Sequence, residues 1–202
     1  MPGAKRIALQ TKFLSLYHYL ADSLPYHIVR WDEKCLETFT THRLLRPLSP
    51  LMIGATYAGD GYLWGLVALF ILMFGASPDY KHVLVGLSVT IINILFFRLF
   101  KVVFKRSRPL YVAPAHDLKY RFLDSYSFPS GHATTSFGIA FILSHYYPLF
   151  PVPILVYGIS SLIAVSRVYV AEHYPSDVIS GALLGTITAQ LFLPIFERMF
   201  RL

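Results

Sequence analysis

Five predominantly apolar segments, separated by short polar stretches, follow residue 56 of the chain. They cover approximately residues 57–76, 83–100, 132–147, 152–168 and 178–195. Each is slightly shorter than the roughly 20 residues that an α-helix needs to cross a bilayer, and flanking Tyr, Lys and Arg side chains extend it to the interface. The pattern predicts an all-α fold, a polytopic membrane helical bundle with about five transmembrane helices.

The N-terminal quarter has a different pattern. Residues 7–24 carry apolar side chains at helical spacing with polar side chains between them, which predicts an amphipathic helix lying in the membrane interface. A helix packed against the rest of the protein fits the same pattern equally well. Residues 25–56 are mixed and fit short interfacial helices. We therefore expect one membrane-embedded domain over residues 1–202, with interfacial helices at 1–56 and a transmembrane core at 57–195.

Composition supports a membrane protein. Only 14% of the residues are charged and the mean hydropathy is +0.52, which is too apolar for a soluble domain of this length. The net charge is +7, and the basic residues flank the apolar segments, so the expected partners are an anionic bilayer surface and an anionic substrate rather than nucleic acid. Cys35 is the single cysteine, which excludes an internal disulfide and a cysteine-based metal cluster.

Alternation of the predicted helices brings distant residues to one membrane face. The second segment ends at Lys101, the third begins at His132, and the link between the fourth and fifth holds Arg167, His173 and Asp177. These residues fall on the same face as the N-terminus, and the C-terminus falls on the other. The long connection at residues 101–131 lies on this face too, and long loops are often functional.

The charge distribution suggests an orientation. Of the 18 Lys and Arg residues, all but Lys81, Arg198 and Arg201 fall on this face, so the positive-inside rule places it in the cytoplasm. Basic residues of the 101–131 loop that attract anionic lipid would bias this count. We expect a multi-pass protein of a bacterial inner (plasma) membrane.

The residues on this face fit the binding of a phosphate ester. Lys101, Arg108 and Arg167 can supply positive charge, the arginines through a bidentate fork and the lysine as a point charge. Ser130 and Gly131 stand where the third apolar segment begins. A helix N-terminus there would present N–H groups to an anion, and glycine permits close approach of the backbone.

Two histidines fit the chemical step. His173 would be a nucleophile, and Asp177, four residues later, would hold one ring nitrogen and stabilise the cation that forms. His132 would be the general acid that protonates the leaving oxygen. The chemistry requires no metal or other cofactor.

Other polar residues have simpler interpretations. Basic residues at segment ends usually anchor helices at the headgroups, which is the interpretation for Lys105, Arg106, Lys119 and Arg121. Glu172 is expected to be a solvated neighbour of the site. Gly181 and Gly185 indicate close helix packing within the monomer.

The three clusters resemble a known signature. Lys101-x6-Arg108-Pro109, Pro129-Ser130-Gly131-His132 and Ser166-Arg167-x5-His173-x3-Asp177 resemble the tripartite signature of the type 2 phosphatidic acid phosphatase (PAP2) superfamily, with every position filled. The resemblance covers residues 57 to 195. Members of the membrane branch commonly have six spans, whereas this chain has about five predicted. Soluble acid phosphatases and vanadate-dependent haloperoxidases belong to the same superfamily, and the hydropathy argues against those branches.

The resemblance implies a metal-independent membrane phosphatase with a helical-bundle core. It implies a phosphohistidine intermediate on His173, oriented by Asp177, with His132 as the acid. Lys101, Arg108, Ser130, Gly131 and Arg167 would hold the phosphate. Similar bacterial enzymes usually have their site on the outer face, in contrast to the charge distribution.

Three functions remain open at this stage. The first is a phosphatase acting on phosphatidylglycerophosphate, phosphatidic acid, a polyprenyl pyrophosphate or a lipid A phosphate. The second is a lipid phosphotransferase with the same intermediate and an acceptor other than water. The third is a non-catalytic scaffold or lipid carrier, which the complete signature disfavours. No obligate protein partner is expected.

Overall fold

The computed structural model describes residues 26–109 and 126–202, and these are helical without strands, which confirms the predicted all-α fold. The elements are α2 (Tyr26–Thr41), the 3-10 helix η1 (Arg43–Leu48), α3 (Ser49–Ala58), α4 (Tyr62–Phe74), α5 (Asp79–Phe104), α6 (Gly131–Tyr146), α7 (Val152–Tyr169) and α8 (Pro175–Phe200). The amphipathic helix predicted at residues 7–24 lies outside the described residues, as do the predicted anchors Lys119 and Arg121.

Each of the five apolar segments corresponds to a helix, from α4 to α8. Within the described ranges, α5, α7 and α8 are each long and apolar enough to cross a membrane. The helical stretch Leu45–Ala58, which joins the end of η1 to α3, forms with α4 a pair that qualifies as one span bent by 63°. The structure therefore has three such helices, or four with the bent pair, instead of about five. The first predicted segment is broken near Gly61, whose φ is 105°, and α6 has only 16 residues because it begins at a buried cap.

Helix α6 lies at the centre of the bundle and packs against α5, α7 and α8. Small residues permit the closest of these approaches. A Cβ at Gly185 of α8 would lie 2.0 Å from the carbonyl oxygen of Thr134, and one at Gly181 would lie 2.5 Å from that of Ser130. The predicted close packing at Gly181 and Gly185 is therefore an α6–α8 contact. Large apolar side chains such as Leu66, Leu95 and Leu191 stay exposed on the outer surface, as expected for contact with lipid.

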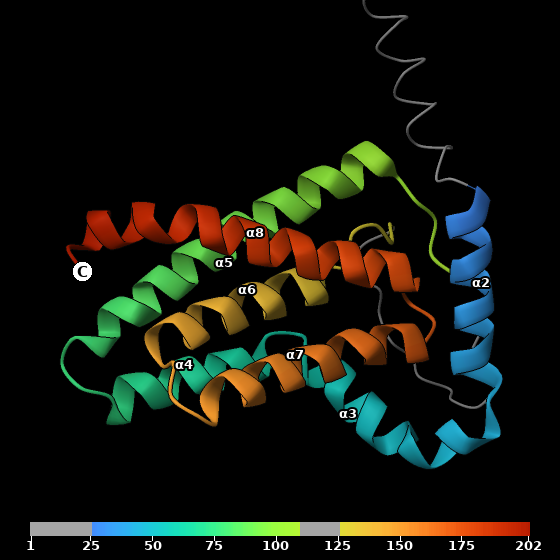
Figure 1. The fold of residues 1–202 in the computed structure, drawn as a ribbon, viewed down its shortest axis with the longest axis horizontal. Helices are drawn as coiled ribbons and strands as arrows, with labels where there is room; N and C mark the ends of the chain where they lie inside the picture. Colours follow the sequence, from blue (N-terminus) through green and yellow to red (C-terminus); the bar gives the residue numbers. More distant parts are fainter. Residues whose placement is uncertain (1–25, 110–125) are drawn as a thin grey trace, which may run out of the picture.

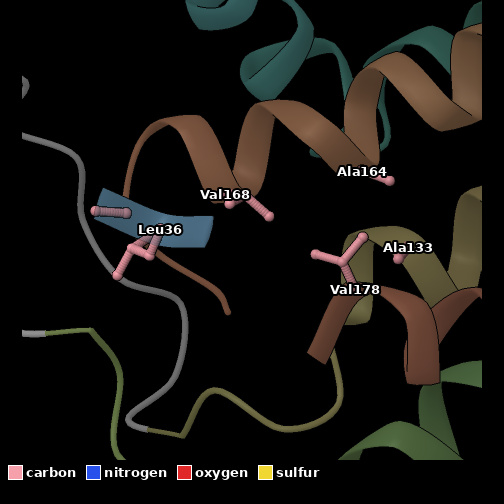
Figure 2. Close-up of a cluster of buried hydrophobic side chains, with 6 residues drawn as sticks. Leu36, Ala133, Ala164, Val168 and Val178 are labelled. Atoms are coloured by element: carbon pink, nitrogen blue, oxygen red, sulfur yellow. The ribbon is translucent and has the colours of Figure 1, made fainter. Parts of the chain in front are cut away.

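The helices alternate in direction, so that α5 and α7 end, and α6 and α8 begin, at the same end of the bundle (Figure 1). The C-terminus lies at the opposite end. Helix α2 runs across the first end and contacts α7 and α8 (Figure 1). Its Leu36 is fully buried in a cluster with Val168 and Val178 (Figure 2). The segment read as interfacial therefore covers the end of the bundle where the signature residues lie.

Candidate active site

The three signature clusters converge on one cavity of about 920 Å³. Helix ends position them: Lys101 lies in the last turn of α5, Arg167 in the last turn of α7, and Gly131 in the first turn of α6. Six of the eight predicted site residues line the cavity, namely Lys101, Arg108, Gly131, His132, Arg167 and His173. The other two, Ser130 and Asp177, are fully buried beside it.

The N-terminus of α6 is built by Ser130. Its hydroxyl accepts a hydrogen bond from the backbone N–H of Ala133 at 3.5 Å, as an N-cap does. Its own backbone N–H donates to the carbonyl oxygen of Asp177 at 3.0 Å. Ser130 thus joins the start of α6 to the start of α8, and the positive end of the α6 dipole is directed at the cavity beside Gly131.

His173 follows the last turn of α7 and is 1% exposed. Its backbone N–H donates to the carbonyl oxygen of Arg167 at 3.2 Å. Burial lowers the pKa of His173 well below its ordinary range, and the positive charges of Arg167, Arg108 and Lys101 lower it further. The ring is therefore neutral at physiological pH, which is the state in which a ring nitrogen can act as a nucleophile.

Asp177 lies closer to an arginine than to the histidine it was predicted to orient. Its Oδ2 is 3.7 Å from Nδ1 of His173, beyond hydrogen-bond distance, and that nitrogen has no hydrogen bond. Oδ2 instead accepts the backbone N–H of Tyr174 at 2.9 Å, and Oδ1 accepts Nη1 of Arg106 at 2.5 Å. The carboxylate faces the ring, but its hydrogen bonds are made elsewhere.

The interpretation of Arg106 as a headgroup anchor is wrong. Its guanidinium bridges Asp177 and Asp32, with Nη2 2.7 Å from Oδ2 of Asp32, and lies 4.0 Å over the ring of Tyr174. Asp32, in α2, is fully buried and accepts the backbone N–H of Ser176 at 2.9 Å. Arg106 and Asp32 therefore connect the covering helix to Asp177.

Glu172 is also not the solvated residue that was expected. It is 4% exposed, and its Oε2 contacts Nη2 of Arg167 and lies 3.2 Å from Nη1 of Arg108. Its backbone N–H donates to the carbonyl oxygen of Arg167 at 3.1 Å, which holds the residue beside the cavity. The Glu172 carboxylate thus contacts both arginines that were predicted to hold phosphate.

The remaining signature residues have specific partners. Lys101 is 3% exposed, and its Nζ donates to the carbonyl oxygen of Tyr126 at 2.6 Å. Nε2 of His132 lies 2.7 Å from Oδ1 of Asp60. Asp60 was not recognised as a site residue. The available signal was a carboxylate within an otherwise apolar segment, a position that is costly unless the group has a function.

The cavity continues from the polar site into the bundle between α4, α5 and α6. Apolar side chains line this extension, among them Ile71, Leu87, Ile94 and Ile139, as far as Tyr146 near the other end of α6. Among the described residues, His, Cys, Asp and Glu side chains form no group of three or more suited to hold a metal ion. The arrangement can bind an anionic group at its polar end and a hydrocarbon chain along its apolar length.

Comparison with known proteins gives one family. The family model described as the PAP2 superfamily matches residues 81–201. The chain is 30% identical over 129 residues to the undecaprenyl-diphosphatase BcrC of Bacillus subtilis, covering 64% of this chain and 65% of that protein. It is 32% identical over 147 residues to an undecaprenyl-diphosphatase of Sulfolobus acidocaldarius, covering 69% of this chain and 66% of that protein. The chain thus spans slightly less than two thirds of the length of these two relatives.

The fold is also similar to a solved structure. A transmembrane PAP2-type phosphatidylglycerolphosphate phosphatase from Bacillus subtilis superposes with a TM-score of 0.67 at 24% identity, covering 94% of this chain and 96% of that chain. The predicted resemblance and the membrane-bundle fold are confirmed, and the chain is an integral membrane protein.

Proposed function

Because this chain belongs to the PAP2 superfamily, we propose that it is a phosphatase that hydrolyses a lipid phosphate monoester or diphosphate through a phosphohistidine intermediate. The observation that carries the proposal is the cavity itself. One end holds a buried neutral imidazole, Lys101 and two arginines, and the rest is an apolar channel within the bundle. A polar head joined to a hydrocarbon tail matches this division.

Binding would place the phosphoryl group among the cations. Arg108 and Arg167 would bind two of its oxygens, Lys101 would neutralise charge on the third, and the α6 N-terminus built by Ser130 and Gly131 would face the same group. These cations supply the charge stabilisation that a bound metal provides in other phosphatases. The proposed reaction is therefore metal-independent.

The covalent step would use both histidines. Nε2 of His173 attacks phosphorus, the bond from phosphorus to the leaving oxygen breaks, and His132 gives that oxygen a proton. Water then attacks the phosphohistidine and returns a proton to His132, and the nitrogen–phosphorus bond breaks to release inorganic phosphate. Asp177, which faces Nδ1 of His173, would stabilise the imidazolium character that develops during the attack.

The substrates to test come from the sequence analysis and from the relatives. Two relatives are named undecaprenyl-diphosphatases and the structural neighbour is a phosphatidylglycerolphosphate phosphatase. Undecaprenyl diphosphate, phosphatidylglycerophosphate, phosphatidic acid and a lipid A phosphate form the panel. We propose that residues 1–202 act as a single domain on such a lipid.

The test is release of inorganic phosphate by the detergent-purified full chain from each lipid in the panel. His173→Ala should abolish release, and His145→Ala is the matched control because His145 lies at the opposite end of the bundle and contacts Glu197. Acid-labile label on the wild-type protein should report the phosphohistidine. Full release by His173→Ala would contradict the proposed nucleophile, and transfer of label to a lipid acceptor instead of water would indicate a phosphotransferase.

Metal dependence is tested in the same assay. Release should persist in EDTA and be inhibited by orthovanadate, which mimics the trigonal-bipyramidal phosphoryl centre. Activity that is lost in EDTA and restored by magnesium would contradict the metal-independent reaction.

We propose from the charge distribution that the site faces the cytoplasm. Lys81 lies at the far end of the bundle, where its Nζ donates to the carbonyl oxygen of Arg201 at 3.0 Å, so few basic residues mark that end. The C-terminus would then lie outside the cytoplasm. A C-terminal fusion to a reporter that works only outside the cytoplasm should therefore be active. A cytoplasmic C-terminus would reverse the orientation.

A further inference from the structure

The corner between α3 and α4 lies directly on His132. A Cβ at Gly59 would lie 2.8 Å from Cδ2 of the His132 ring and 2.6 Å from Cγ2 of Ile163, so the contact requires glycine. Gly61 then takes a φ of 105°, which favours glycine as well. Between these two glycines, Asp60 places Oδ1 2.7 Å from Nε2 of His132.

Packing alone does not explain this carboxylate. Ser136 lies one turn after His132 in α6, and its Oγ accepts a hydrogen bond from Nε1 of Trp64 at 3.0 Å. This hydrogen bond joins α4 to α6 without any charge. Asp60 and His132 are both half-buried. A carboxylate is costly in a membrane protein unless a partner compensates for lost water, and the partner here is the ring assigned as the general acid.

The charges around this ring have opposite signs. Arg167 from α7, Arg108 from the segment after α5, and His173 lie on the cavity with His132. The carboxylate of Asp60 contacts the ring directly. The positive charges of Arg108 and Arg167 would disfavour the protonated, positively charged form of His132. A carboxylate in direct contact with the ring opposes them.

We propose that Asp60 is a positioning residue for His132, a role that rests on the proposed function. Its carboxylate accepts the Nε2–H of the ring and so directs Nδ1–H at the leaving oxygen. As the bond from His173 to phosphorus forms and the bond to the leaving oxygen breaks, the proton on Nδ1 moves to that oxygen. Water returns a proton to Nδ1 in the second step, and Asp60 itself neither gains nor loses one.

The test compares two leaving groups on the full chain in detergent. An alkyl phosphate monoester needs a proton on its leaving oxygen, whereas an aryl phosphate of matched chain length leaves as a stable phenolate. Asp60→Asn keeps the shape of the side chain and removes its charge. General acid catalysis contributes about 10²–10⁴-fold, so we expect kcat for the alkyl ester to fall on the order of tenfold or more, with KM and the aryl ester nearly unchanged.

Two further variants make the result specific. Ser136→Ala removes the hydrogen bond from Trp64, loosening the same pair of helices without touching Asp60, and should leave the alkyl-to-aryl ratio unchanged. His132→Ala should lower that ratio at least as much as Asp60→Asn. The ratio is independent of the fraction of protein that is folded, so a poorly folding variant still reports.

Each outcome decides a different point. If His132→Ala lowers the ratio and Asp60→Asn does not, the role of Asp60 is refuted and the proposed function stands. If His132→Ala lowers both rates equally, the acid role in the proposed function fails and the role of Asp60 fails with it. The absence of hydrolysis of either ester by the wild type would remove the premise of both.

Discussion

At the scale of single residues, a negative charge lies against both arginines of the site. The carboxylate of Glu172 contacts both Arg108 and Arg167, and Glu172 is only 4% exposed. In the proposed function, an incoming phosphoryl group would bind the same guanidinium forks. We therefore expect substrate binding and the Glu172 contacts to compete for the same donors.

Glu172→Gln should strengthen inhibition by orthovanadate. The amide keeps the size of the side chain but removes its negative charge, so leaving the arginines no longer breaks an ion pair and costs less. We expect the inhibition constant to fall several-fold. Glu197→Gln, at the far end where Glu197 contacts His145 and Tyr146, is the matched control. Weaker inhibition of Glu172→Gln would show that Glu172 holds the arginines in place instead.

The neutral state of His173 predicts a pH dependence of stability. Burial lowers the pKa of His173 in the folded protein, whereas the unfolded ring titrates near its usual value of about 6.5. Below that pH the unfolded chain takes up a proton that the folded ring does not, so stability falls as the pH falls. The loss in Tm between pH 7.5 and 5.5 should be smaller in His173→Asn than in the wild type, measured in one detergent. Equal losses would mean that the folded ring is protonated too.

At the scale of helices, the site depends on how closely α6 and α8 approach. Gly185 lies where a Cβ would be 2.0 Å from a backbone oxygen of α6, while Gly158 of α7 has nothing within 4 Å of its Cβ position. Gly185→Ala should lower Tm by several degrees, since overpacking costs about 1–3 kcal/mol. Gly158→Ala should leave Tm unchanged or raise it, because alanine favours helix. Similar effects of the two variants would mean that the helices separate without cost.

Much of this arrangement could be predicted from the sequence, because apolar runs define helices and alternation defines which ends meet. The three signature clusters share a cavity as the spacing predicted. Two features could not be predicted in this way. The chain breaks after α3 where Gly59 packs on His132 and Gly61 takes a positive φ, and α6 begins at the buried cap of Ser130. None of these features is visible as periodicity.

The missed side chains have a similar cause. Glu172 and Arg106 lie beside signature residues, and their neighbours along the chain suggest solvent or headgroups. Their burial depends on partners that fold in from elsewhere: Asp32 reaches Arg106 from 74 residues away and Arg108 reaches Glu172 from 64 residues away. A pattern read along the chain does not reveal which side of a loop faces such partners.

At the scale of the whole molecule, the cavity joins the polar site to an apolar channel. Ile139 of α6 lines that channel, whereas Leu191 of α8 is 62% exposed on the outer surface. Ile139→Trp should fill part of the channel and raise KM for a long-chain lipid phosphate, with little effect on a short water-soluble aryl phosphate. Leu191→Trp, with the same added bulk facing lipid, should change neither. If Ile139→Trp affected both substrates equally, the channel would not hold the hydrocarbon chain of the lipid.

The hydrogen bond from Ser176 to Asp32 joins residues 144 positions apart. Asp32 is synthesised early, with α2, but its partner emerges only with the first turn of α8. A nascent chain that stops before α8 already contains His173 but lacks Ser176 and Asp177, which fasten α2 over the site. We therefore expect α2 to settle over this end of the bundle only after the first turn of α8 has been synthesised, late in the assembly of the described helices.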